Sequence, residues 1–391
     1  MQGDQQTSSV VGINQSQGAK RNLSMALRDR LRQWGAPDNV LLMPAILIIL
    51  FLSIFPLFVS LFLSFSRIRF VRGGFEINFV GWANYAKIFT GSEQRHFLGR
   101  FDSPSIFGWL LFAVIVGGML WMFMTYLRNG KRSIFGTIMW CVTLVITAAL
   151  SFLVASTTLN DEGLPGTLVV TLIFVFVGVS VQYLIGLGLA MLLTQDIPGK
   201  RIFRVMFLLP MMITPVGIGF LFRMLTDTSK GPFATLWYNA GLADFSFLST
   251  AHGARMAVLI GDTWQWTPFV FIILLAALEG IPRETIEAAM VDGANRVQMF
   301  FSIILPQIIP VSTTVILIRL IEAFKIIDMP NVLTYGGPGT ATESVTLHAY
   351  SAWRALDLGG SAALAYVLLF VVTFVALVFV NIIRTRLLRL V

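Results

Sequence analysis

Long apolar runs alternate with short polar segments along the chain after residue 40. Each of eight runs is close to or longer than the roughly 20 apolar residues that a helix needs to cross a bilayer core about 30 Å thick. The pattern therefore predicts an all-α, polytopic membrane protein with about eight transmembrane helices. We expect these helices at residues 41–66, 106–126, 134–156, 167–193, 203–225, 255–278, 306–325 and 360–383.

The basic residues next to the runs predict the orientation of the helices. Segments rich in lysine and arginine stay in the cytoplasm by the positive-inside rule. Alternation of the spans then places both termini, and the polar segment around residue 290, in the cytoplasm. The segment 67–105 should face outward, although it is basic too. Three groups of basic residues carry this prediction and are expected in the cytoplasm. They are Arg128, Lys131 and Arg132 between the second and third runs; Lys200, Arg201 and Arg204 between the fourth and fifth; and Arg384, Arg386 and Arg389 after the last.

Composition supports a membrane protein and argues against several other classes. Of 391 residues, 56% are hydrophobic and 12% charged, against about 25% charged in an average globular domain. The net charge of +8 lies mostly beside apolar runs, which indicates membrane topology rather than nucleic-acid binding. A single cysteine, Cys141, allows no intramolecular disulfide. His96, His252 and His348 are scattered in the sequence, so we interpret them as loop residues without a metal-binding role.

A polar-to-apolar segment, EAAMVDGANRVQMFFSIILP, interrupts the pattern between the sixth and seventh runs. Pro282 suits the first turn of a helix, and the glutamates that follow favour its positive end. We expect this helix at residues 283–291, ending at Gly293. Asn295 can cap a second helix that reaches Pro306, where the next span begins. The prediction is a cytosolic helix-turn-helix.

The spacing of residues in this segment resembles the EAA loop of ABC importer permeases. The matching positions are Glu287, Ala288, Ala289, Asp292, Gly293, Ala294, Leu305 and Pro306. Other segments are similar to the same family, among them GWANYAKIF at 81–89 and VLTYGGPGTATESVTLHAY at 332–350. The resemblance implies a type I ABC importer permease core, similar to the larger permease half of maltose-type systems in the carbohydrate uptake class.

The resemblance also implies partners. A dimer of separate ABC ATPase subunits would hold the loop in a cleft, beside a second permease subunit and an extracytoplasmic substrate-binding protein that delivers a carbohydrate. The chain would lie among the lipids of a bacterial cytoplasmic membrane, without nucleic acid, and would catalyse no bond change. Its glycine-rich stretch at 336–339 lacks the Lys-Ser/Thr ending of a phosphate-binding loop. We therefore expect no cofactor on this chain, and ATP only on the separate subunit.

The expected organisation has four regions, and one of them departs from the family pattern. The family's usual core has six spans, so two spans of this chain are additional. The role of this additional hairpin stays open. The regions are 1–40, a cytosolic tail with a basic amphipathic segment; 41–105, the first core span and an outer loop; 106–158, the hairpin; and 159–391, the permease core with its EAA loop at 280–306.

Polar residues inside the apolar runs are candidates for substrate binding. At membrane depth such groups usually face a cavity or a helix interface. Asp262, Gln265 and Trp266 begin the sixth run, and Met211 lies beside prolines in the fifth. Indole rings and an amide suit a sugar ring, whereas tryptophan is also common at any membrane surface.

Two interpretations stay open for Arg319 in the seventh run. It could pair with Glu322, one helical turn away, and simply pack between helices. Alternatively it faces the cavity and donates hydrogen bonds to substrate. For the whole protein, the alternative function is a secondary active transporter of small polar solutes, which should contain inverted repeats and ion-coupling carboxylates. Neither feature is clear in the sequence.

Overall fold

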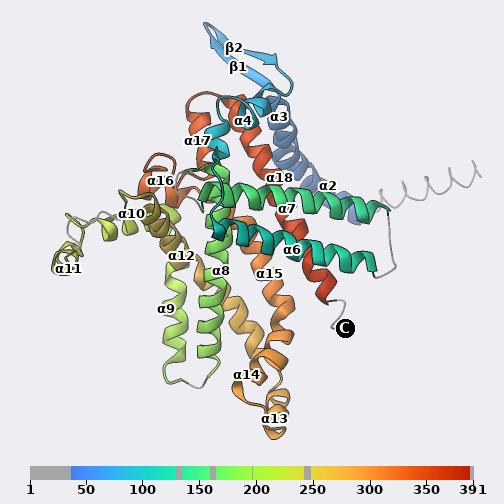
Figure 1. Cartoon of the computed structure of the whole chain (residues 1–391), viewed down its shortest axis with the longest axis vertical. Helices are drawn as coiled ribbons and strands as arrows, with labels where there is room; N and C mark the ends of the chain where they lie inside the picture. The colour runs from blue at the N-terminus through green and yellow to red at the C-terminus, as the bar shows by residue number, and fades with distance from the viewer. Residues whose placement is uncertain (1–36, 129–133, 159–163, 196, 242–247, 388–391) are drawn as a thin grey trace, which may run out of the picture. The chain divides into compact units, whose positions relative to one another are not determined.

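The computed structural model describes residues 37–128, 134–158, 164–195, 197–241 and 248–387 (Figure 1). The predicted tail and amphipathic segment before residue 37 lie outside the described residues. Contacts within the chain divide it into two compact units, Met1–Phe62 and Leu63–Val391.

The first unit contributes most of the first membrane span. Its apolar stretch from Leu42 to Ser64 is long enough to cross a bilayer. The stretch is helical throughout and includes one π-helical turn. Its elements are α2 (Pro37–Ile49), η1 (Leu50–Ile54) and α3 (Phe55–Ser64), and the last two residues of α3 belong to the second unit.

The second unit contains the other long apolar helices. In the described part of the chain, seven helices are long and apolar enough to cross a membrane, or up to eight if one bent pair counts as a span. The predicted fold class is confirmed. The long helices of this unit are α6 (Ile106–Arg128), α7 (Ile134–Thr158), α8 (Thr167–Leu193), α12 (Ala251–Glu279), α15 (Leu305–Ala323) and α18 (Leu358–Leu387).

The bent pair corresponds to the run predicted as a single span at 203–225. It consists of α9 (Lys200–Met212) and α10 (Pro215–Thr226), whose axes differ by 97°. Thr214 is extended between them and accepts a hydrogen bond from the Gly217 N–H at 3.3 Å, so it caps α10. The run is therefore broken rather than straight, because Pro215 starts a new helix in a new direction.

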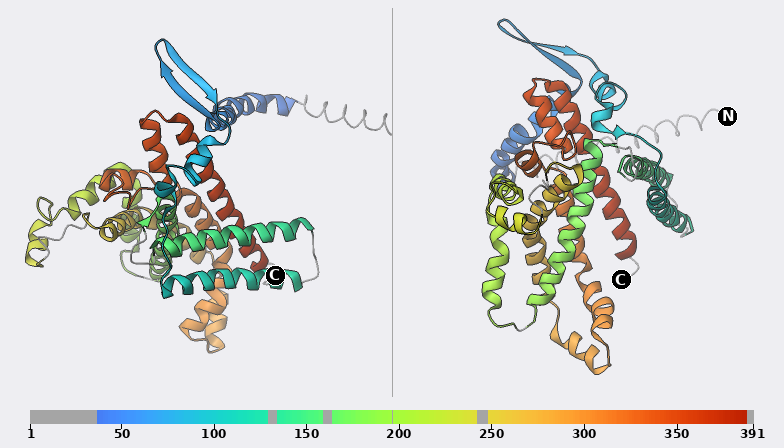
Figure 2. Two further views of the ribbon diagram at one scale, coloured as in Figure 1. Left: turned by 45° about the horizontal axis from the view of Figure 1, so that its top comes forward. Right: turned by 60° about the vertical axis from the view of Figure 1, so that its left-hand side comes forward.

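Short elements connect the long helices. Two small antiparallel sheets, β1–β2 and β3–β4, are additions to an otherwise helical fold. The helices α4 and α17 lie at one end of the second unit, and α13 and α14 lie at the other (Figures 1 and 2). The short elements are β1 (Ser66–Val71), β2 (Gly74–Phe79), α4 (Ala83–Phe89), α5 (Gln94–Phe97), β3 (Gly99–Arg100), β4 (Leu164–Pro165), α11 (Ala234–Asn239), α13 (Arg283–Val291), α14 (Arg296–Met299), η2 (Phe300–Ile304), α16 (Asp328–Thr334) and α17 (Val345–Arg354).

The core of this unit is centred on α8, which packs against α12, α15 and α17. Val169 and Val175 of α8 are fully buried, as is Phe271 of α12. The backbones of α8 and α12 approach closely at Gly186, where an added Cβ would lie 2.9 Å from Val270 Cγ1. Glycine is required at such a contact because any side chain would collide.

Candidate functional site

The loop resembling an EAA motif forms two short helices joined by a tight turn. α13 occupies Arg283–Val291, as predicted. Gly293 has φ +79°, and the Gly293 and Ala294 N–H groups donate to the carbonyls of Met290 and Ala289 at 3.1 and 3.0 Å. This is the glycine-dependent helix ending in which two otherwise unpaired carbonyls find donors.

The second helix of the loop has a reciprocal cap. Asn295 Oδ1 accepts from the Gln298 N–H at 2.9 Å, and Gln298 Oε1 accepts from the Asn295 N–H at 2.9 Å. The helix continues through the π-helical η2 into α15, so residues 296–323 form one candidate span. Pro306 lies at the second position of α15, close to where that span was expected to begin, but the helix before it continues into α15 without a break.

Several apolar side chains of this loop are exposed. Val291 is 87% exposed, Val297 66%, Phe301 62% and Met290 55%. Glu287 and Ala288 are exposed as well, whereas Ala289 is buried. An apolar patch on a polar turn outside the helical core is typical of a protein-interaction surface.

A second polar site is a buried cluster on three long helices. Arg319 of α15 donates from Nε to Gln182 Oε1 of α8 at 2.8 Å and from Nη2 to Asp262 Oδ2 of α12 at 3.1 Å. Gln182 Nε2 donates to the same Asp262 oxygen at 2.8 Å. The Arg319 guanidinium lies over the ring of Trp266, with Cζ 4.6 Å from the ring centroid. The Arg319 side chain is 2% exposed and that of Asp262 10%.

This geometry corrects the expected partner of Arg319. Glu322 points elsewhere and forms an ion pair with Lys325 at 2.9 Å. The helical spacing of 319 and 322 is right for a local pair, but Asp262 offers a buried carboxylate instead. The expected pair with Glu322 is thus wrong in its partner, and a role of Arg319 in substrate binding stays a prediction.

The candidate substrate residues do not gather around one cavity. A cavity of about 650 Å³ lies between α8, α9 and α12, and Thr263, Trp264 and Thr267 line it. Asp262 and Gln265 are buried, at 7% and 4% exposure. Met211 is exposed on the surface of α9 instead of lining this cavity.

Residues 182–389 match the family described as binding-protein-dependent transport system inner membrane component. The chain belongs to this family. The permease is therefore a multi-pass inner-membrane subunit of a binding-protein-dependent ABC importer, and it is not an enzyme. This membership excludes the secondary-transporter alternative.

Relatives and a solved structure agree with the family. The permease is 33% identical over 217 residues to the trehalose/maltose transport system permease protein MalF of Thermococcus litoralis, covering 56% of this chain and 74% of the relative. It is 28% identical over 228 residues to the probable starch degradation products permease AmyD of Thermoanaerobacterium thermosulfurigenes, covering 58% and 77%. A crystal structure of a bacterial ABC transporter involved in import of the polysaccharide alginate has the same fold, with TM-score 0.62, 18% identity and coverage of 92% and 99%.

The sequence interpretation missed a third polar cluster in the permease. His96 and His348, 252 positions apart, stack with ring centroids 3.9 Å apart. Glu93 lies within 3.5 Å of both rings, and Glu343 Oε2 lies 2.7 Å from His96 Nε2. The interpretation of the histidines as loop residues is therefore wrong: His96 lies in α5, His252 in α12 and His348 in α17. Distance along the chain did not reveal that His96 and His348 are in contact, because α5 and α17 meet only in the folded protein.

Neighbouring groups shift the pKa values of these histidines in opposite directions. The hydrogen bond to Glu343, helped by the charges of Glu343 and Glu93, raises the pKa of His96 although burial opposes it. Burial and repulsion by His96 lower the pKa of His348 to about 4. His348 therefore stays neutral at neutral pH, so the two stacked imidazoles do not both carry a charge.

Proposed function

We propose that this permease is one transmembrane half of an ATP-driven importer of sugars or related carbohydrates. The names of its relatives support the substrate class, since they refer to trehalose and maltose, starch degradation products and sulfoquinovosyl glycerol. The partners would be a dimer of ABC ATPase subunits, a second permease and an extracytoplasmic binding protein.

The observation that carries the proposal is the exposed, doubly capped helix-turn-helix. In it, Glu287, Ala288, Asp292 and Gly293 lie on α13 and its turn, beside exposed Val291. The apolar side chains would enter a cleft of the ATPase subunit, and the acidic ones would meet basic groups there. Because the second helix is continuous with α15, closure of the ATPase dimer would move a membrane helix directly.

The substrate path is proposed beside the buried cluster rather than through it. Gln182, Asp262 and Arg319, with Trp266 stacked on the guanidinium, would hold α8, α12 and α15 together, while Thr263 and Trp264 line the adjacent cavity. An indole beside a hydroxyl can stack on a sugar ring and hydrogen-bond to it. Met211 and Glu322 would contribute only through the exposed faces of their helices.

Substitutions at two motif positions of the loop, one that reverses a charge and one that adds bulk, test the coupling role. Glu287→Arg and Gly293→Trp should leave the permease in the membrane but abolish ATP-driven uptake of labelled trehalose or maltose and co-purification of the ATPase subunit. Glu284→Arg is the matched control, because Glu284 is an exposed glutamate on the same helix outside the motif. Normal uptake by both motif variants would contradict the docking role. If the ATPase co-purifies with wild-type protein but no sugar is taken up, only the substrate class fails.

The proposed topology places both termini and the α13–α14 turn in the cytoplasm, and α4, α5 and α17 outside. Cysteines introduced at Ser92 and at Gln298, in a Cys141→Ser background, provide the test, since both positions are exposed. An impermeant thiol reagent should label Ser92→Cys in intact cells and Gln298→Cys only after the cells are opened. The reverse labelling would overturn the orientation.

A further inference from the structure

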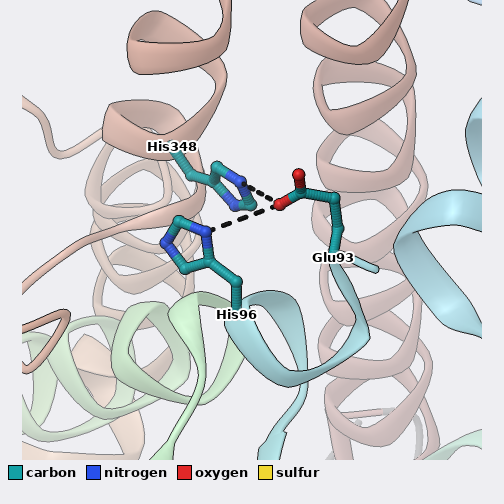
Figure 3. A group of neighbouring side chains, drawn as sticks. All are labelled: Glu93, His96 and His348. Carbon is teal, nitrogen blue, oxygen red and sulfur yellow. Dashed lines mark ion pairs between the residues drawn. The ribbon is translucent and has the colours of Figure 1, made fainter. Parts of the chain in front are cut away.

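The cluster of Glu93, His96 and His348 lies at the end of the second unit opposite to the α13–α14 turn (Figures 1 and 3). Glu93 directly precedes the short α5 that contains His96, and His348 lies on α17. The geometry points to a binding site for a divalent transition metal of the zinc class, with one oxygen and two imidazole nitrogens as ligands. This inference is independent of the transported substrate and of the coupling loop.

Two of the three separations between the ligand atoms fit a tetrahedral ion. Glu93 Oε2 lies 3.5 Å from His96 Nδ1 and 3.5 Å from His348 Nε2 (Figure 3). All three atoms lie within 4.8 Å of one another. Two ligands that each lie about 2.1 Å from a tetrahedral zinc ion are about 3.4 Å apart. The distance from the carboxylate oxygen to each nitrogen is therefore already close to the distance between two ligands of one zinc ion.

The atoms not used as ligands have partners that fix the orientation of each side chain. His96 Nε2 lies 2.7 Å from Glu343 Oε2, and His348 Nδ1 lies 3.3 Å from Thr167 Oγ1. Metal-bound histidines usually donate their second N–H to a carboxylate or another oxygen, which sets the tautomer and increases ligand basicity. The other oxygen of Glu93, Oε1, lies 3.5 Å from Lys87 Nζ, which leaves Oε2 directed at the histidines.

One of the three side chains is buried and two are partly exposed, so an ion could reach the site from solvent. The His348 side chain is 6% exposed, whereas Glu93 and His96 are 31% and 32% exposed. Binding would also separate the stacked rings, because a nitrogen lone pair lies in the plane of its imidazole. The bound ion would then join the segment after the first span to α17, which precedes the last span. The fourth position would stay open to water, as in zinc sites with three protein ligands.

Zinc binding by the full permease, purified in its complex with a tag that contains no histidine, tests the inference. After loading with Zn²⁺ and removal of free ion, wild-type protein should retain about one zinc per permease chain, measured by mass spectrometry of the metal. X-ray absorption should show two imidazole ligands and one carboxylate at about 2.0–2.2 Å. His96→Gln and Glu93→Gln should lose the bound zinc, and Glu343→Gln should bind about 10–100-fold more weakly.

His252→Gln is the matched control, because His252 is the third histidine of the chain and is exposed on α12. It should bind zinc like the wild type. Equal zinc retention by His96→Gln and Glu93→Gln would overturn the site, as would a wild type that retains no more zinc than His96→Gln. The Glu93 variant guards against misfolding, since Glu93 is partly exposed and glutamine keeps its shape.

Discussion

The α13–α14 turn and the Arg319 cluster are both polar parts of an apolar chain, but they are built in opposite ways. In the turn, the capping bonds join residues three to five positions apart, and most side chains are exposed. In the cluster, the bonds to Arg319 span 57 and 137 positions, and the guanidinium is buried. The turn is held by its own sequence, whereas the cluster exists only after three helices have packed.

The difference has an energetic side. Exposed polar groups lose little when a partner is removed, because water replaces it. A buried ion keeps its desolvation cost when its partner is removed, which amounts to about 3–5 kcal/mol for one member of a buried pair. Damage to the turn should therefore reduce coupling more than stability, and damage to the cluster should reduce stability first.

The largest expected effect is that of Asp262→Asn. This change leaves the Arg319 cation buried without a counter-charge and should destabilise the permease by about 3–5 kcal/mol in chemical unfolding in detergent. Glu322→Gln is the matched control, because Glu322 forms an ion pair with Lys325 whose side chains are 44% and 62% exposed. Exposed pairs contribute about 0–1 kcal/mol, so the control should stay close to wild type.

The double variant Asp262→Asn with Arg319→Gln sharpens the same comparison. Since no unpaired charge remains, it should recover most of the stability that either single variant loses, which a double-mutant cycle measures. If stability and uptake both return, the cluster acts by packing. Recovered stability without uptake would instead give Arg319 a role in substrate passage. A double variant that is no more stable than Asp262→Asn would contradict the pairing of Asp262 with Arg319.

The same contrast explains what the sequence could predict. The α13 bounds, the Gly293 ending and the Asn295 cap follow from residue types a few positions apart, and all three agree with the structure. The apolar runs predicted the long helices for a similar reason, since length and composition suffice. The 97° bend was less accessible, because prolines indicate a break but give no angle.

Long-range partners could not be predicted in this way. Glu322 was the nearest acidic residue to Arg319 in the sequence, but the partner of Arg319 comes from another helix. The pairing of His96 with His348 is hidden for the same reason, since α5 and α17 meet only through tertiary packing. A polar residue inside an apolar run indicates that a partner is needed, but only the folded structure shows which residue that partner is.

The smallest expected effect is that of Asn295→Ala, at the other extreme of the comparison. Loss of the side-chain cap should destabilise the start of α14 by about 1 kcal/mol. Because the capping box joins only exposed residues of the turn, global unfolding should change little. Hydrogen exchange should therefore become faster at residues 296–299 and stay unchanged in α8 and α12. Asn295→Ser, which preserves a capping oxygen, is the control and should keep exchange near wild type. Faster exchange throughout α8 and α12 would mean that the turn and the helical core unfold together.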